Sequence, residues 1–142
     1  MLKLEYFNRQ GDFFSPMSRE ELKNMIADYM NKGYLENIID MFKYDTSLYR
    51  FIGDMISDER IRVRIGTTAL IEELKETRPE EVALALPSLL PLLEDDNPTV
   101  RGDAAYLIGL IGEPEGLERL KPLLEDPSPQ VVEVVRDTLN GY

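Results

Sequence analysis

Apolar residues recur along the C-terminal half of the chain with the three- and four-residue spacing of amphipathic helices. One such stripe lies between residues 98 and 112 and consists of Val100, Ala104, Leu107, Ile108 and Ile111. A second lies between residues 115 and 125 and consists of Leu117, Leu120, Leu123 and Leu124. Gly112 and Pro114 stand between the stripes, and these residue types commonly end one helix and begin the next. The pattern therefore predicts a pair of antiparallel helices.

This helix pair is part of an internal repeat. Residues 92–100 (LLEDDNPTV) align with residues 123–131 (LLEDPSPQV) at an offset of 31. Residues 56–59 and 63–64 align with residues 93–96 and 100–101 at an offset of 37. This offset exceeds the first by six residues, which fit a longer helix and turn near Pro79. Periods in this range are typical of solenoids, in which stacked helix pairs share one continuous core.

Extending the repeat over the chain predicts an all-α solenoid of antiparallel helix pairs with about eight helices. The expected helices span residues 18–31, 34–44, 46–57, 60–76, 79–94, 98–112, 114–125 and 129–140. We expect an N-terminal arm at residues 1–17, degenerate helical repeats at 18–57 and clear repeats at 58–142. Residues 18–142 would form a single continuous domain.

The clearest repeat carries a family resemblance. Residues 96–112 (DNPTVRGDAAYLIGLIG) resemble the HEAT-like repeats named after the phycobilisome lyases, in which an acidic-proline turn precedes Val-Arg, two alanines and Leu-Gly-x-Ile-Gly. The resemblance covers residues 56–139, with departures at Glu72, Val132 and Arg136. It implies a right-handed, armadillo-like α-α superhelix. It also implies a non-catalytic protein-interaction scaffold or adaptor, or alternatively a regulatory or chaperone-like subunit of a larger enzyme.

The composition excludes several kinds of active site. The sequence has no Cys and no His, so a Ser-His-Asp or Cys-His site and a zinc-thiolate site cannot be built from this chain. A carboxylate site for Mg²⁺ or Ca²⁺ stays open, but no twelve-residue calcium loop is present and the acidic clusters lie at helix starts and turns. The glycines at 102, 109 and 112 follow no strand and precede no Lys-Ser or Lys-Thr, so they are not a phosphate loop. We expect no cofactor, no metal and no enzyme activity.

Comparison with enzymes that contain HEAT-like repeats also leads us to expect no enzyme activity. Deoxyhypusine hydroxylases hold iron with His-Glu pairs, and this chain has no His. DNA glycosylases of this group need a basic groove with aromatic residues, whereas this chain is acidic and lacks Trp. Known bilin lyases are much longer than the matching segment.

The charge of the chain indicates which partners it can have. The formal net charge is −11, and a field of this sign repels nucleic acid and anionic membranes. Residues 1–71 carry 10 basic and 11 acidic groups, whereas residues 72–142 carry 6 and 16, so the C-terminal half favours a basic partner surface. With no secretory signal and no apolar run of roughly 18 residues, we expect a cytoplasmic protein.

Aligning two helices of the repeat in register suggests a partner-binding surface. At the offset of 31, the pairs of equivalent positions are Leu84 and Glu115, Pro87 and Glu118, Ser88 and Arg119, and Leu90 and Lys121. If equivalent positions have equivalent exposure, Leu84, Pro87 and Leu90 form an apolar patch that Glu115, Glu118 and Arg119 flank, as in protein-binding surfaces. The alternatives are that a central helix is buried on more sides, or that Phe13 and Phe14 fold back over it.

Other residues have a structural and a functional interpretation. Arg64 and Arg101 occupy equivalent positions and either bind an anion or form an inter-repeat ladder with Asp58, Asp95 and Asp126. The aromatic pairs at 6–7 and 13–14 either form a docking arm or cover the first helix pair. The helix near 129–140 is either a plain terminal cap or, through Val132 and Val134, the interface of a homodimer.

Overall fold

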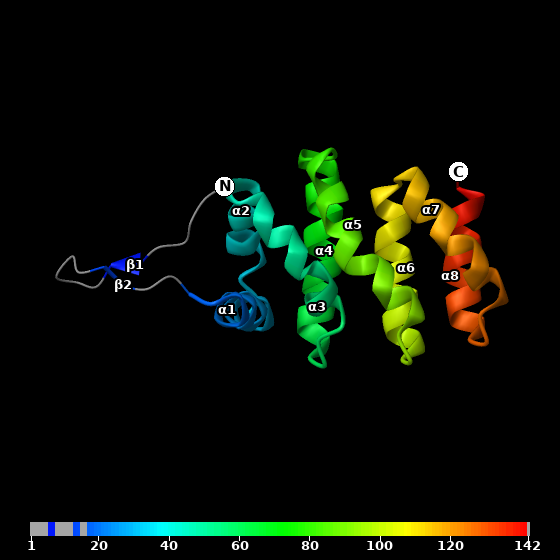
Figure 1. The fold of residues 1–142 in the computed structure, drawn as a ribbon, viewed down its shortest axis with the longest axis horizontal. Coiled ribbons are helices and arrows are strands. Elements are labelled where there is room, and N and C mark those ends of the chain that lie inside the picture. The colour runs from blue at the N-terminus through cyan, green and yellow to red at the C-terminus, as the bar shows by residue number, and fades with distance from the viewer. Residues whose placement is uncertain (1–5, 8–12, 15–16, 142) are drawn as a thin grey trace.

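The computed structural model describes residues 6–7, 13–14 and 17–141, and it shows helices stacked side by side along one axis (Figure 1). Two short strands, β1 (Tyr6–Phe7) and β2 (Phe13–Phe14), precede the stack. The described helices are α1 (Arg19–Asn31), α2 (Leu35–Tyr44), η1 (Thr46–Phe51), α3 (Ile52–Ile56), α4 (Ile61–Thr77), η2 (Glu81–Ala85), α5 (Leu86–Leu89), η3 (Leu90–Glu94), α6 (Pro98–Ile111), α7 (Pro114–Leu120), η4 (Lys121–Glu125) and α8 (Pro129–Asn140), where η marks a 3₁₀-helix. The all-α solenoid expected from the repeat is confirmed.

The stack has two layers. The A layer consists of the long helices α4, α6 and α8, which pack side by side, and the B layer consists of η1–α3, η2–α5–η3 and α7–η4. Helices α1 and α2 begin the stack, and both pack against α4. Figure 1 shows α1 nearly end-on, so it crosses the direction of the other helices. One continuous cluster of buried apolar side chains runs from Leu22 in α1 to Val135 in α8.

The sequence signals at the helix ends act as expected. The Asn97 side chain accepts a hydrogen bond from the Thr99 N–H and caps the start of α6, with Pro98 in the first turn. Helix α6 ends at Gly112, whose φ of 77° lies in the left-handed region that favours glycine. Ser18 accepts from the Glu21 N–H and caps α1 in the same way.

The B-layer segments differ from the continuous helices predicted at 79–94 and 114–125. Each is a short α-helix joined to 3₁₀ turns. Pro87, Pro91 and Pro122 stand at the first turns of α5, η3 and η4. A proline in a helix removes one backbone hydrogen bond and clashes with the carbonyl four residues earlier, so a segment with prolines is divided into short helical pieces.

The N-terminal strands form an antiparallel pair in which Tyr6 faces Phe14 and Phe7 faces Phe13. Figure 1 draws this pair beyond α1, at the opposite end of the stack from α8. The side chains of these four aromatic residues lie outside what the structure describes. Whether they dock on a partner or cover the first helices therefore stays a prediction. Among the helices of the described ranges, none is both long and apolar enough to cross a membrane.

Candidate functional site

The predicted apolar patch lies in the B layer, and two of its three residues, Leu84 and Pro87, are exposed. Leu84 in η2 is 51% exposed, and its repeat equivalent Glu115 in α7 is also exposed. Pro87 and its equivalent Glu118 are both exposed as well. Equivalent exposure therefore holds at these two pairs of positions, and Leu84 is an apolar side chain at a place where the next repeat has a carboxylate.

The third patch residue, Leu90, and the neighbouring Ser88 are engaged in internal contacts. The Ser88 hydroxyl accepts a hydrogen bond from the Gly53 N–H at 2.9 Å and donates one to the Ala85 carbonyl at 3.0 Å. Leu90 is partly buried and packs against the core. The central B-layer segment, η2–α5–η3, lies between α3 and α7 and also packs on α6. It is therefore covered on more sides than it would be in an isolated helix pair.

The charged residues expected to flank the patch lie on α7 and η4. Glu115 and Arg119 are exposed, and neither forms an ion pair with any residue that the structure describes. Glu118 pairs with Lys121 at 2.8 Å, and both side chains are more than half exposed. An exposed pair of this kind contributes little to stability and leaves both groups accessible.

The inter-repeat ladder forms between Arg101 and Asp126. Arg101 Nε and Nη2 donate to the two carboxylate oxygens of Asp126 at 2.8 and 2.9 Å. Arg101 Nη1 also donates to the carbonyl oxygens of Asp95 and Asp96 at 2.8 and 3.2 Å. Hydrogen bonding by Arg101 lowers the pKa of Asp126 below its ordinary value. Arg101 thus ties the turn before α6 to the turn before α8.

Arg64, the repeat equivalent of Arg101, forms the hydrogen bonds to backbone carbonyls but, among the described residues, not the pair with a carboxylate. Its Nη1 donates to the carbonyl oxygens of Asp58 and Glu59 at 3.0 and 3.1 Å. In the described part of the chain it forms no ion pair with a carboxylate. Burial raises the pKa of the Asp103 carboxyl group in α6, and the Arg64 charge partly offsets this rise. The Arg64 charge also contributes to the lowered pKa of Asp58.

The other two carboxylates of the predicted ladder, Asp58 and Asp95, accept hydrogen bonds from other residues. Asp95 accepts a hydrogen bond from the Asn97 N–H at 2.9 Å. Asp58 pairs with Arg60, which also reaches Asp28 at 2.7 Å. The hydrogen bond from Arg60 lowers the pKa of Asp58 below its ordinary value. The structure therefore brings together Arg101 and Asp126, but it does not bring Arg64 to Asp95.

The C-terminal helix uses most of its apolar residues internally. Val131 and Val135 are buried, and Val134 packs against the core at half burial. Val132 is half-buried and lies outside that cluster. A homodimer through this helix stays a prediction, and Val132 is the residue on which it now depends.

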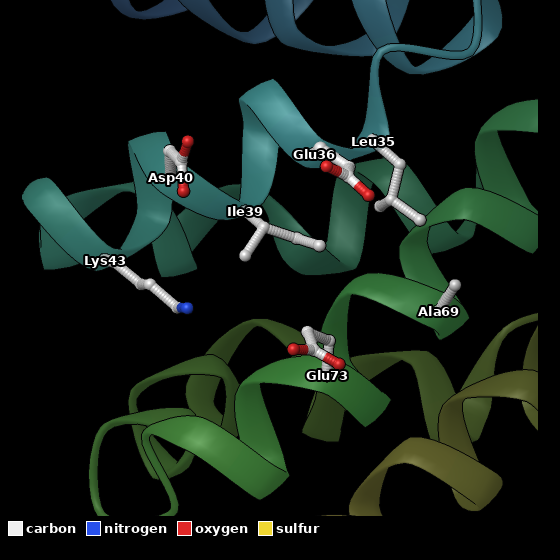
Figure 2. Close-up of a pocket in the computed structure, with 7 residues that line it drawn as sticks. All are labelled: Leu35, Glu36, Ile39, Asp40, Lys43, Ala69 and Glu73. Carbon is white, nitrogen blue, oxygen red and sulfur yellow. The ribbon is translucent and has the colours of Figure 1, made fainter.

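A groove between α2 and α4 was not predicted from the sequence. It encloses about 480 Å³, and its lining residues are Leu35, Glu36, Ile39, Asp40, Lys43, Ala69 and Glu73. The residues from α2 fall on one helix face, because Leu35, Ile39 and Lys43 follow at intervals of four and so do Glu36 and Asp40. Figure 2 shows Lys43 and Glu73 at the space between the two helices, with Ile39 between Lys43 and Glu36. The repeat alignment gave no signal for this groove because α2 has no aligned counterpart.

The charged groups of this groove have no partners among the residues that the structure describes. Glu36, Asp40, Lys43 and Glu73 form no side-chain hydrogen bond and no ion pair with the residues that the structure describes. The groove therefore holds three carboxylates and one ammonium group that are unpaired within the described ranges. No cluster of three or more potential ligands for a metal ion exists there or elsewhere in the described ranges.

Comparison with protein families assigns most of the chain to a known repeat family. A family model described as HEAT repeats matches residues 50–140, which is more than half of the chain and runs from η1 into α8. It does not distinguish the phycobilisome-lyase type from other HEAT repeats, and it leaves out α1 and α2. No curated protein matches the chain.

Proposed function

This chain belongs to the HEAT-repeat family, and we propose that it is a non-catalytic scaffold or adaptor that binds another protein through its B layer. HEAT repeats generally mediate protein–protein interactions, because stacked helix pairs offer an extended surface. The observation that carries the proposal is the exposure of Leu84 and of Pro87, which follows it after the buried residues Ala85 and Leu86. In the next repeat the equivalent positions are Glu115 and Glu118, so the apolar surface is specific to one repeat rather than common to the fold.

The chemistry of this surface suits a protein partner. An apolar centre with a charged rim is the usual anatomy of a protein interface. Covering the exposed half of Leu84 would contribute roughly 1 kcal/mol, given about 25 cal/mol for each Å² of apolar surface buried. A glutamate at this position would lose that contribution and would place a charge in the contact.

Leu84→Glu is the variant that tests this proposal. Because Leu84 is half exposed, we expect the substitution to change the free energy of unfolding by less than about 1 kcal/mol. We expect it to weaken partner binding more than tenfold, since tenfold corresponds to about 1.4 kcal/mol. The measurement is capture of partners on the immobilised chain from an extract of its source cells, with mass spectrometry, followed by calorimetric titration of the captured protein.

Ile61→Glu is the matched control, because Ile61 is an aliphatic residue of the A layer with 60% exposure. It should retain the partner that Leu84→Glu loses. Leu90→Glu is unsuitable, because Leu90 packs against the core and its loss would disturb folding. If Leu84→Glu is folded and still captures the same protein with the same affinity, the B layer is not the binding surface.

A further inference from the structure

The groove between α2 and α4 lies outside the B layer, and its chemistry differs from that of the Leu84 surface. We propose that this α2–α4 groove binds an arginine-bearing segment of a partner protein. The inference rests on the protein-binding function proposed above, but it assigns a second contact site with its own ligand chemistry. The groove is formed by α2 and α4, whereas Leu84 lies in η2. Its lining residues can therefore be substituted without changing the Leu84 surface.

The floor of the groove is apolar. Leu35, Ile39 and Ala69 are half-buried, and the first two pack against the core from one side while lining the groove with the other. The volume of about 480 Å³ lies within the range of about 300–1,000 Å³ typical of ligand pockets. Aliphatic walls of this kind accommodate the methylene stem of a long side chain.

The rim of the groove is negatively charged. Glu36 and Asp40 lie on the α2 side and Glu73 lies on the α4 side, as Figure 2 shows. The one cation, Lys43, leaves a net charge of −2 and is not within ion-pair distance of any of the three carboxylates. A cationic side chain that enters the groove would therefore meet unpaired acceptors on both walls.

Arginine fits this combination of floor and rim better than lysine does. Its planar guanidinium carries five donors and can bind carboxylates on two sides at once. It is also more weakly hydrated than an ammonium group, so it loses less when it lies against an aliphatic floor. An anionic ligand would meet three carboxylates against one ammonium group, which disfavours phosphate and nucleic acid.

Fluorescence anisotropy with two labelled peptides tests the proposal. The first peptide has two arginines alternating with leucines, and the second has citrulline, a neutral analogue of similar shape, in place of each arginine. We expect the wild-type chain to bind the arginine peptide at least tenfold more tightly than the citrulline peptide. The groove variant Glu36→Gln/Asp40→Asn/Glu73→Gln should lose that preference and bind the arginine peptide at least tenfold more weakly.

The control variant makes the same change of charge at the far end of the stack. Glu125→Gln/Glu133→Gln/Asp137→Asn neutralises two glutamates and one aspartate that are exposed and form no ion pair with the described residues. It should weaken binding of the arginine peptide by less than about twofold. Equal weakening by the groove and control variants would overturn the proposal, because it would mean that the peptide responds only to the overall negative charge.

Lys43→Met gives a result that a misfolded protein cannot imitate. Removing the one cation of the groove should tighten binding of the arginine peptide severalfold, and unchanged or weaker binding contradicts the proposal. The Leu84→Glu variant should bind the arginine peptide as the wild type does. If the arginine peptide fails to bind while partner capture still depends on Leu84, the groove proposal fails and the proposed function stands.

Discussion

At Gly53, α3 approaches the backbone of α5 so closely that no side chain fits. A Cβ atom built there would lie 2.2 Å from the Ser88 carbonyl oxygen and 3.0 Å from the Ser88 carbonyl carbon. Because these are backbone atoms, they cannot move aside by changing a rotamer. We expect Gly53→Ala to lower the free energy of unfolding by about 1–3 kcal/mol, the usual cost of overpacking, as measured by urea unfolding.

Gly102→Ala is the control for this prediction. Gly102 lies within α6, and the nearest atom to a Cβ built there is the Val131 Cγ2 at 3.9 Å, which is an ordinary contact distance. Alanine is favoured over glycine inside a helix by about 0.5–1 kcal/mol. The control should therefore raise the stability slightly, and a loss of stability similar to that of Gly53→Ala would contradict this account of the two sites.

Single residues show where reasoning from the sequence ends. Leu84 was predicted to be exposed from one repeat alignment, and it is. Ser88 looked solvated because it aligns with Arg119, but its hydroxyl bonds to Gly53, which is 35 positions earlier in the chain. Nothing in the repeat pattern indicates that contact, because it depends on how two B-layer segments pack against each other.

At the scale of elements, the Arg101–Asp126 pair joins α6 to the turn before α8. The two side chains are only 13% and 7% exposed. The folded-state pKa of Asp126 lies below its value in the unfolded chain, so the pair contributes stability above about pH 4 and loses it as the pH falls through the folded-state pKa. We expect Asp126→Asn to lower the melting temperature at pH 7, with a difference from wild type that shrinks as the pH falls below about 4.

Asp137→Asn provides the comparison for the pH series, because Asp137 is exposed and forms no ion pair with any described residue. Its melting temperature should follow the wild type across the pH range. A loss of stability in Asp126→Asn that is as large at pH 2 as at pH 7 would show that packing, rather than the charge of Asp126, accounts for the contribution.

The elements also show why some predictions from sequence succeeded and others did not. Helix starts at Ser18 and Asn97 and the helix end at Gly112 depend on local hydrogen bonds and dihedral angles, so the sequence indicates them directly. The division of the B-layer segments by prolines could have been read from the sequence but was not. The α2–α4 groove could not, because it depends on how α2, which the family match leaves out, packs on α4.

At the scale of the whole molecule, the most buried helix of the A layer, α6, lies next to the last helix of the stack, α8. Helix α6 has neighbours on both sides in the A layer, and it buries seven of its 14 residues. Helix α8 has a neighbour on one side and buries two of its 12 residues, Val131 and Val135. In a solenoid each unit contacts only its neighbours, so stability depends on how many neighbours a unit has.

Because the end repeats of a solenoid have a neighbour on one side only, we expect the middle of the chain, residues 79–112, to exchange its amide hydrogens most slowly, with the slowest exchange in α6. Amides of α6 should exchange only through global unfolding, whereas those of α8 should also exchange through local opening at the end of the stack. We expect native-state hydrogen exchange of α8 to be more than tenfold faster than that of α6, which corresponds to a difference of about 1.4 kcal/mol in the free energy of opening.

If α8 amides are as well protected as those of α6, the stack does not open from this end. Another surface must then cover the outer side of α8, as the predicted homodimer through Val132 would. Repeating the exchange over a range of protein concentrations separates these two outcomes, because protection by a second copy of the chain declines on dilution.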